Sequence, residues 1–368
     1  MCTFAMQRCN EKEKFMSEKI RIGISQGDSN GIGYEVIIKT LSDPRIQDFC
    51  IPVIYGSSRL FSYYRKMVAP SDNFSMNIIG ITGEIKNKQI NIVNCVPDEI
   101  RVEPGKSTPD AAQAALRSLQ TAVNDLKTKK IDVLVTAPFN KETMQGGNFS
   151  FPGHTEYLAK AFGVQEPLMF LVSEILKVGV VTGHVPLSQV SSLITKESVL
   201  QKLQLMNRSL KSDFGIRRPR IAVLGLNPHA GDAGLLGKEE DLSISPAIAE
   251  ANRLGILAFG PYPADGFFGA STFRRFDATL AMYHDQGLTP FKALSFCDGV
   301  NFTAGLPIVR TSPAHGVAYN IAGTGQASPD SMRAAIYAAC DIFRNRKKDD
   351  QLRDGAMESI NIENLPQN

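Results

Sequence analysis

The sequence predicts an α/β protein with a largely parallel β-sheet. Short β-branched runs alternate with longer amphipathic stretches along the 368 residues, which is the pattern of this class. The run IDVLVTAP (131–138) is apolar almost throughout, as expected of a strand that helices cover on both faces. Several apolar runs end in a polar turn that contains glycine. Together these three observations favour an open α/β sheet.

A local pattern supports each predicted element. IRIGIS (20–25) is predicted to be a strand and GIGYEVIIKTL (31–41) the helix that follows it. The clearest helix covers 110–130, because Thr108 and Pro109 are residues that favour a helix N-terminus. The remaining elements are strands at 51–56, 131–138, 167–173, 178–183, 220–228 and 278–284, a strand-like segment at 301–312 and a last helix at 328–348.

Composition excludes several classes of protein. The net charge of +3 is too small to indicate a nucleic-acid or membrane partner. No run reaches the roughly 18–20 apolar residues that a membrane span requires. The six cysteines lack CxxC spacing, so reduced thiols are expected and a disulfide framework is not. We therefore expect a cytoplasmic protein.

The N-terminal segment is expected to be a disordered tail. Residues 1–16 are rich in charge and lack the apolar core of a secretion signal, and Met16 is a candidate start of translation. The rest of the chain has no internal repeat, low-complexity segment or Pro/Ser linker. Any division into domains must therefore arise by packing, as two lobes beside a cleft.

All five histidines lie in short motifs marked by glycine or proline. A single histidine of this kind is usually held by a backbone carbonyl, but a whole set of them favours a metal or catalytic centre. The turns at the predicted strand ends lie where open α/β sheets bind ligands, and their side chains are expected to converge on one crevice. These turns are 27–33, 136–141, 182–184, 227–234 and 283–287.

Three of the histidines are candidate metal ligands. His184, His229 and His284 each follow a predicted strand. Neutral imidazoles suit zinc, cobalt or similar ions, and three protein ligands leave positions open for a substrate. No HxH or HExxH spacing supports the assignment, so the alternative that each histidine caps its own turn stays open.

A second group of residues suits an anion. Lys292, Asn301 and Arg310 surround the strand-like segment, and Lys141 follows Asn140. Ammonium, amide and guanidinium groups together suit a phosphate or a carboxylate, although each could equally be a solvated basic or polar residue. The loop GDSNGIG could also hold an anion at a helix N-terminus, but it matches neither the Rossmann nor the P-loop pattern.

Several motifs in order resemble those of the 4-hydroxythreonine-4-phosphate dehydrogenase family, over about residues 20 to 345. They are GDSNGIGYE, TAPFNK, GHTEYLA, GLNPHAGDAG, PYPADGFF, MYHDQGL, VNFTAGLPIVRTS and HGVAYNIAG. The resemblance implies a fold like that of isocitrate and isopropylmalate dehydrogenases, with two lobes and a central cleft. The cofactor lobe would comprise 17–135 plus 295–368, and 136–294 would carry the metal histidines and a homodimer interface that includes the active site.

The resemblance also implies roles for individual residues. One divalent ion (zinc, cobalt or magnesium) would be bound by His184, His229 and His284. The implied substrate-binding residues are His154, Thr155, Lys292, Asn301 and Arg310. NAD or NADP would lie against Gly31, His315, Asn320 and Gly323. Asp265 and Asp285 would orient a ligand or relay protons, or else cap their turns.

Some residues depart from the family pattern. Ser29, Asn30 and Tyr34 replace common residues near the implied cofactor crevice, and Ala314 stands where an acidic residue is frequent. Asn320 stands where isopropylmalate dehydrogenases have an aspartate. These differences leave open the choice between NAD and NADP and the details of the acid–base step.

The implied activity is oxidation and decarboxylation of 4-phosphohydroxy-L-threonine to 3-amino-2-oxopropyl phosphate in pyridoxal 5'-phosphate biosynthesis. One alternative is a paralogous dehydrogenase for D-erythronate 4-phosphate or a phosphothreonine stereoisomer. A phosphate acyltransferase of similar fold and a non-catalytic sensor of phosphorylated metabolites are alternatives from other classes, but neither needs three metal histidines.

Overall fold

A computed structural model describes residues 19–355, apart from 70, 72–73, 81–82, 98, 141–150 and 152. The predicted tail at 1–16 and Lys141 lie outside the described residues. Within the described part, no helix is both long and apolar enough to cross a membrane.

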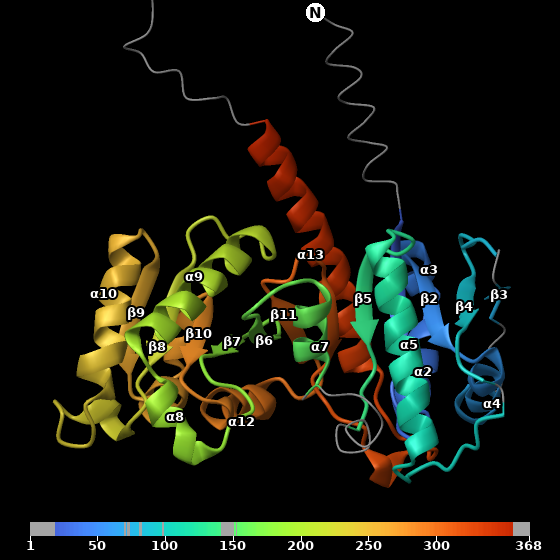
Figure 1. Cartoon of the computed structure of the whole chain (residues 1–368), viewed down its shortest axis with the longest axis horizontal. Coiled ribbons are helices and arrows are strands. Elements are labelled where there is room, and N and C mark those ends of the chain that lie inside the picture. Colours follow the sequence, from blue (N-terminus) through green and yellow to red (C-terminus); the bar gives the residue numbers. More distant parts are fainter. Residues whose placement is uncertain are drawn as a thin grey trace, which may run out of the picture.

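A single sheet of 12 strands runs through the molecule, in the order β3-β4-β2-β1-β5-β12-β11-β6-β7-β10-β8-β9 (Figure 1). Neighbouring strands are parallel except at β12/β11, β11/β6 and β6/β7. The predicted α/β class with a mostly parallel sheet is confirmed. The strands are β1 (Ile20–Ser25), β2 (Cys50–Gly56), β3 (Met76–Ile79), β4 (Ile90–Asn94), β5 (Val133–Thr136), β6 (Leu168–Val172), β7 (Lys177–Val180), β8 (Arg220–Leu224), β9 (Leu257–Tyr262), β10 (Ala278–Ala281), β11 (Val300–Ala304) and β12 (Arg310–Pro313).

The three antiparallel pairings reverse the direction of the sheet. Strands β7, β10, β8 and β9 run opposite to β1, β2, β4 and β5. The carboxyl ends of the two groups therefore lie at opposite edges of the sheet. This reversal was not predicted, because a run of apolar residues does not reveal the direction of its strand. The predicted convergence on one crevice holds for residues of three of the five turns, 136–141, 182–184 and 283–287, which line the same cavity.

The residue ranges predicted for the two lobes can be compared with the order of the strands in the sheet. Every strand from β3 to β11 in the sheet order belongs to 17–135 plus 295–368, except for the last residue of β5. Every strand from β6 to β9 belongs to 136–294. The division itself stays a prediction. The segment 301–312, predicted as strand-like, is two antiparallel strands, β11 and β12, joined by a turn at Gly305.

The helices cover both faces of the sheet (Figure 1). Thr108 caps α5 as predicted, since its Oγ1 accepts a hydrogen bond of 3.3 Å from the N–H of Ala111. The α-helices are α2 (Gly33–Leu41), α3 (Arg45–Phe49), α4 (Ser58–Val68), α5 (Pro109–Lys127), α7 (His154–Ala161), α8 (Leu187–Leu193), α9 (Lys196–Ser212), α10 (Ser245–Arg253), α11 (Ala264–Gly269), α12 (His284–Leu294) and α13 (Asp330–Asp354). The shorter turns are η1 (Pro228–Gly231), η2 (Glu240–Ile244), η3 (Thr272–Arg275) and η4 (Tyr319–Ile321).

Alternation along the strands sorts the core onto the two faces. Val133 and Val135 of β5 belong to one large cluster, which continues under α2, α13, α9 and α10. Leu134 points to the other face and packs with α5. Further along that second face, Val178 of β7 packs with α11 and α12 in a separate cluster. The apolar cover of the second face is thus divided into two clusters, with the central strands between them.

Candidate functional site

A cavity of about 260 Å³ lies on the second face of the sheet, over the central strands. Its floor includes Leu171 of β6, Asn301 of β11 and Ser312 of β12. These three residues lie side by side, because Asn301 pairs with Leu171 on one side and with Ser312 on the other. Residues of α7 and α12 form walls, so the cavity occupies the region between the two apolar clusters.

The cavity brings together most of the predicted substrate and metal residues, which come from distant parts of the chain. The predicted residues that line it are His154, Thr155, His184, His284, Lys292, Asn301, Arg310 and His315. The predicted residues that do not line it are Gly31, His229, Asp265, Asp285, Asn320 and Gly323.

Arg310 is a buried cation whose described hydrogen bonds go to neutral hydroxyl groups. Its Nε and Nη2 donate to Thr136 Oγ1 at 3.1 and 2.7 Å, and its Nη1 donates to Thr303 Oγ1 at 3.2 Å. Burial lowers the pKa of the guanidinium to about 10, and the charge of Glu156 acts in the opposite direction. A buried charge without a counter-charge in hydrogen-bond contact is destabilising, so this position favours an anionic ligand.

Asn301 adds a second polar group to the floor. Its Oδ1 is buried and has no hydrogen-bond partner among the described residues. Lys292, on α12, is exposed and lines the same cavity. The cavity therefore offers two cations for a phosphorylated or carboxylated ligand, and the amide oxygen of Asn301 as an acceptor for a hydrogen-bond donor.

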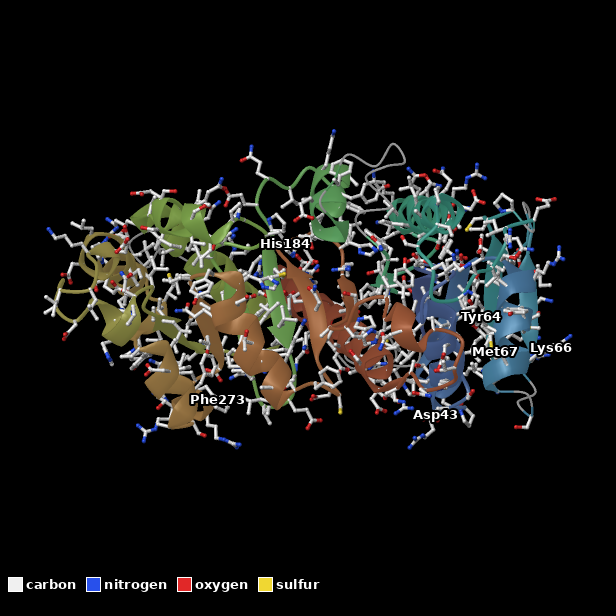
Figure 2. All side chains as sticks on the ribbon, turned by 90° about the horizontal axis from the view of Figure 1, so that it is seen from below. Asp43, Tyr64, Lys66, Met67, His184 and Phe273 are labelled. Carbon is white, nitrogen blue, oxygen red and sulfur yellow. The ribbon has the colours of Figure 1, made fainter. Side chains whose placement is uncertain are left out.

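Two imidazoles lie next to each other at the cavity. The rings of His184 and His284 are 5.5 Å apart between centroids, and Figure 2 shows His184 near the middle of the molecule. His284 begins α12, and its Nδ1 lies 2.7 Å from Asp285 Oδ1. That contact leaves Nε2 of His284 for a ligand, and a carboxylate at the other ring nitrogen is a common feature of metal-binding histidines.

The third predicted metal ligand, His229, lies apart from this pair. It is an exposed residue of η1 with a φ of 53°, in a loop whose Leu226 and Asn227 N–H groups donate to Glu240 Oε1. Within the described ranges, no three His, Cys, Asp or Glu side chains are grouped closely enough to hold a metal ion. Within the described residues, a single chain therefore brings together two of the three histidines predicted to bind the metal ion.

The predicted cofactor residues lie in two loops that contact each other. Tyr319 OH donates to Asp28 Oδ2 at 2.5 Å, and the N–H of Ile32 donates to the carbonyl of Val317 at 3.1 Å. Burial raises the pKa of Asp28, although hydrogen bonds from Tyr319 and Asn30 oppose this shift. The two loops are thus one connected unit.

Glycine is required at position 31 by this contact. A Cβ there would lie 2.2 Å from Val317 Cγ1, so Gly31 allows the close approach of the loops and does not face open space. Asn320 is exposed, and Gly323 has a φ of 76°. His315 reaches the cavity; burial lowers its pKa, and its Nε2 has no hydrogen-bond partner among the described residues.

Two predicted carboxylates are exposed. Asp265 lies in the first turn of α11, and the Asp285 side chain is 80% exposed beside His284. The sequence analysis missed Glu156, which lines the cavity from the first turn of α7. A signal was present, since Glu156 directly follows His154 and Thr155 in the motif GHTE.

Comparisons with known proteins agree on one family. The family described as pyridoxal phosphate biosynthetic protein PdxA matches residues 48–339. A 4-hydroxythreonine-4-phosphate dehydrogenase of Bacteroides thetaiotaomicron is 53% identical over 336 residues, which cover 91% of this chain and 92% of the relative.

Two further matches bear on fold and substrate. A crystal structure of 4-hydroxythreonine-4-phosphate dehydrogenase from Klebsiella pneumoniae superposes with a TM-score of 0.76 at 34% identity, and covers 89% of this chain and 99% of that chain. A protein of Oceanobacillus iheyensis, provisionally named D-threonate 4-phosphate dehydrogenase, is 39% identical over 331 residues, covering 89% of this chain and 99% of the relative.

Proposed function

The chain belongs to the pyridoxal phosphate biosynthetic protein PdxA family, and from that premise we propose that it is an oxidoreductase that acts on 4-phosphohydroxy-L-threonine. It oxidises and decarboxylates this substrate to 3-amino-2-oxopropyl phosphate, with NAD or NADP as the hydride acceptor. The observation that carries the proposal is the cavity in which the buried guanidinium of Arg310 and the paired imidazoles of His184 and His284 face the same space.

The basic residues of the cavity bind and orient the substrate. Arg310 and Lys292 hold its anionic groups, with the phosphate as the main anchor, and Asn301 contacts the substrate from the floor of the cavity. His154 and Thr155 complete the wall on the α7 side. An anchored phosphate fixes the position of the carbon that loses hydride, and such orientation supplies a large part of catalysis in a two-substrate reaction.

The reaction takes place in two steps, an oxidation and a decarboxylation. The C–H bond at the hydroxyl-bearing carbon breaks, its electron pair leaves as hydride to the nicotinamide, and the hydroxyl proton is released. The product is a 3-keto acid, whose carboxyl group then leaves as carbon dioxide while a proton adds to the neighbouring carbon. The cofactor is assigned to the side of the connected loops, which contain Gly31, His315, Asn320 and Gly323.

A divalent ion (zinc, cobalt or magnesium) belongs to this proposal. His184 and His284 would bind it, and the partner subunit's His229 would supply the third imidazole. Such an ion lowers the pKa of a hydroxyl group bound to it and stabilises negative charge on oxygen. Asp285 would hold the ring of His284 in position.

Exposed leucines of α8 and of the segment that follows the His229 loop support a homodimer. They are here called the leucine surface: Leu187, Leu193, Leu235, Leu236 and Leu242. The two parts of this surface are in contact, because Ser191 of α8 donates a hydrogen bond to Glu239. Large exposed apolar surfaces commonly mark interfaces. A second copy that covers this surface would bring its own His229 loop to the interface.

Mixing two inactive variants tests the shared site. We expect His184→Ala and His229→Ala each to be inactive and folded. Refolded together, they form mixed dimers that have one intact site, so about a quarter of the wild-type activity should return. If all three histidines acted within one chain, the mixture would stay inactive.

The reaction is tested by NADH formation from purified, metal-loaded protein. We expect 4-phosphohydroxy-L-threonine to be preferred over D-threonate 4-phosphate and D-erythronate 4-phosphate. Preference for D-threonate 4-phosphate would support the second candidate, which the Oceanobacillus iheyensis relative favours. Turnover that persists after chelation of divalent metals would argue against the metal site and for another class of enzyme.

A further inference from the structure

Glu156 is the one acidic side chain among the described residues that line the cavity. It lies in the first turn of α7, and its side chain is 38% exposed. The other ionisable groups around it are basic: Lys292, Arg310 and the histidines. A single carboxylate in a basic cavity is a specific feature, because it weakens the attraction for an anionic ligand unless it binds a cationic part of that ligand.

The substrate of the proposed function carries such a cationic part. 4-Phosphohydroxy-L-threonine has a phosphate and a carboxylate, and it also has an ammonium group on the carbon next to the one that is oxidised. The cations of the cavity match the first two groups. The ammonium group needs an acceptor, and Glu156 supplies the only carboxylate oxygens on the described wall.

The position of Glu156 matches the order of groups in the substrate. Its Oε1 lies 4.0 Å from Nδ1 of His184, which belongs to the imidazole pair assigned to the reacting hydroxyl. Hydroxyl and ammonium are on adjacent carbons of the substrate. A hydroxyl beside His184 therefore places the ammonium group within reach of Glu156.

We propose, on the basis of the proposed function, that Glu156 binds the α-ammonium group of the substrate and determines specificity for the amino acid over its hydroxy-acid analogues. D-Threonate 4-phosphate and D-erythronate 4-phosphate have a hydroxyl at this carbon, so their net charge is more negative by one. Glu156 repels that additional charge and finds no ammonium partner, and selection against a wrong ligand commonly works in this way.

The exposure of Glu156 sets how strongly it can discriminate between the amino acid and its hydroxy-acid analogues. A charge pair that is partly open to water is weakened by solvent and salt, so the discrimination is moderate and falls as ionic strength rises. Glu156 does not fix the ring of His184 through a direct hydrogen bond, since 4.0 Å exceeds the distance of such a bond and is that of a long ion pair.

The test compares Glu156→Gln with wild type on both kinds of substrate. We measure kcat/KM for 4-phosphohydroxy-L-threonine and D-threonate 4-phosphate at low and high salt. The substitution should reduce kcat/KM for the amino acid about 10- to 100-fold and leave the hydroxy acid unchanged or improved. The ratio between the substrates should therefore fall about tenfold or more. Calorimetric binding of each substrate without nicotinamide should show the same change.

Two further variants make the result specific. Glu166→Gln is the matched control, because Glu166 lies outside the cavity and pairs with Lys202 at 3.4 Å; its ratio should equal that of wild type. Glu156→Asp keeps the charge and should keep most of the preference. An equal loss for both substrates in Glu156→Gln would overturn the proposal and make Glu156 a positioning residue for His184.

The failure of the proposed function would be visible separately. If wild-type protein does not turn over 4-phosphohydroxy-L-threonine, both the proposed function and this inference are wrong. If wild type prefers the amino acid and Glu156→Gln keeps the same ratio, only the inference on Glu156 is wrong.

Discussion

Arg310 illustrates how one buried residue sets the chemistry of the cavity. Its described hydrogen bonds go to Thr136 and Thr303, both neutral, so no counter-charge is in hydrogen-bond contact with it, although Glu156 acts on it from a greater distance. Burying such a charge lowers the stability of the ligand-free protein in exchange for a strong interaction with the ligand. We therefore expect Arg310 to contribute more to ligand binding than to folding.

Substitution of Arg310 by Met should separate binding from stability. Loss of the buried charge offsets loss of the hydrogen bonds to Thr136 and Thr303, so the free energy of unfolding should change by less than about 1 kcal/mol. The KM for the phosphorylated substrate should rise about 100-fold or more. Urea unfolding and steady-state kinetics check this. A strongly destabilised variant would show that Arg310 is a structural residue.

His315 makes stability depend on pH. Burial lowers its pKa from the ordinary value of 6.5, so the unfolded chain takes up the proton first as the pH falls. The stability linked to His315 is therefore fully present above about pH 6.5 and is lost as the pH falls through the lower pKa of the folded state. When the pH falls from 8 to 5.5, we expect the free energy of unfolding to decrease less in His315→Gln than in wild type. The difference between the two decreases should be less than about 1 kcal/mol, because the ring is only partly buried. Urea unfolding of both proteins at the two pH values measures this difference. Equal decreases in the free energy of unfolding for wild type and His315→Gln would contradict the prediction.

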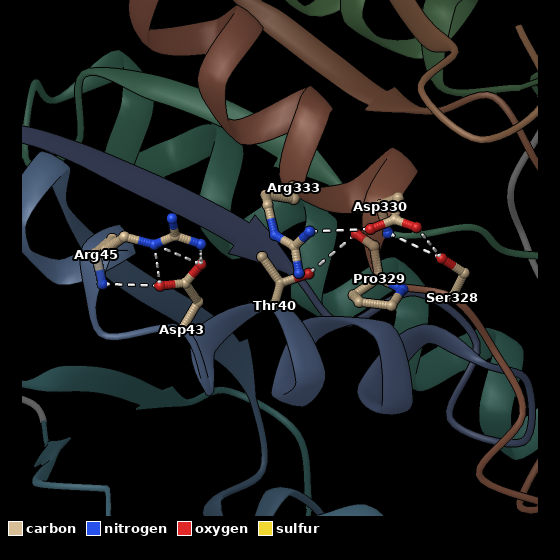
Figure 3. A network of polar contacts seen from close by, with 7 residues as sticks. All are labelled: Thr40, Asp43, Arg45, Ser328, Pro329, Asp330 and Arg333. Carbon is tan, nitrogen blue, oxygen red and sulfur yellow. Dashed lines mark hydrogen bonds and ion pairs between the residues drawn. The ribbon is translucent and has the colours of Figure 1, made fainter.

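At the scale of elements, the start of α13 is attached to α2 (Figure 3). Thr40 Oγ1 donates to the carbonyl of Pro329 at 3.3 Å, and Asp330 accepts hydrogen bonds from Ser328 and Arg333 at 2.7 and 2.9 Å. A second connection lies one turn earlier in α2. There the fully buried Glu35 accepts hydrogen bonds from Lys39 Nζ and from the N–H of Ala327. These contacts hold the end of the 315–329 segment, which carries predicted cofactor residues.

Lys39→Met should destabilise this connection. Lys39 Nζ contacts Glu35 Oε1 at 2.9 Å and also the carbonyls of Gly325 and Ala327. Removing it leaves the buried carboxylate of Glu35 without its cation, which costs about 3–5 kcal/mol in comparable pairs. Chemical denaturation should show this loss, together with weaker binding of the nicotinamide cofactor.

The matched control is Lys66→Met, on the exposed side of α4. It should change stability by less than about 0.5 kcal/mol. Equal effects of the two substitutions would mean that the Glu35–Lys39 pair contributes nothing beyond an exposed lysine.

At the scale of the whole molecule, the reversal of strand direction creates the site. The parallel strands in one half of the sheet run in the opposite direction to those in the other half. The antiparallel strands β11 and β6 join the two halves at the centre of the sheet. Polar residues of β11 and β12 then face the gap between the two apolar clusters of the second face. The cavity therefore exists because the two halves of the sheet join at β11 and β6 and leave a gap between their apolar clusters.

Assembly is tested on the leucine surface. Leu235→Glu replaces a side chain that is 79% exposed in the chain and would be buried in the proposed dimer. We expect monomers and loss of turnover, because the partner's His229 no longer reaches the site. Leu352→Glu, at a residue of α13 that is 65% exposed, is the control and should stay dimeric and active. Sedimentation velocity and NADH assays measure both; a dimeric, active Leu235→Glu would contradict the assignment of this surface.

Most of the polar residues that line the cavity could be predicted from the sequence, because they stand in short motifs that resemble those of a known family. Glu156 was missed although it belongs to such a motif, since a carboxylate in the first turn of a helix is ordinary on its own. The strands β3, β4 and β9 were not predicted, because partly exposed strands have a weaker apolar pattern than the buried β1 or β5.

By itself, the sequence determined the α/β class and most of the buried strands and helices, because alternation, capping and turn chemistry act over a few neighbouring residues. The candidate site residues came from short motifs and from their resemblance to a known family. Only the tertiary structure decided the direction of each strand, the closeness of His184 to His284 and the separation of His229 from both. Those features depend on which distant strands pair, as β6 does with β11. Pairing of this kind is selected by the packing of the whole chain, and no local pattern encodes it.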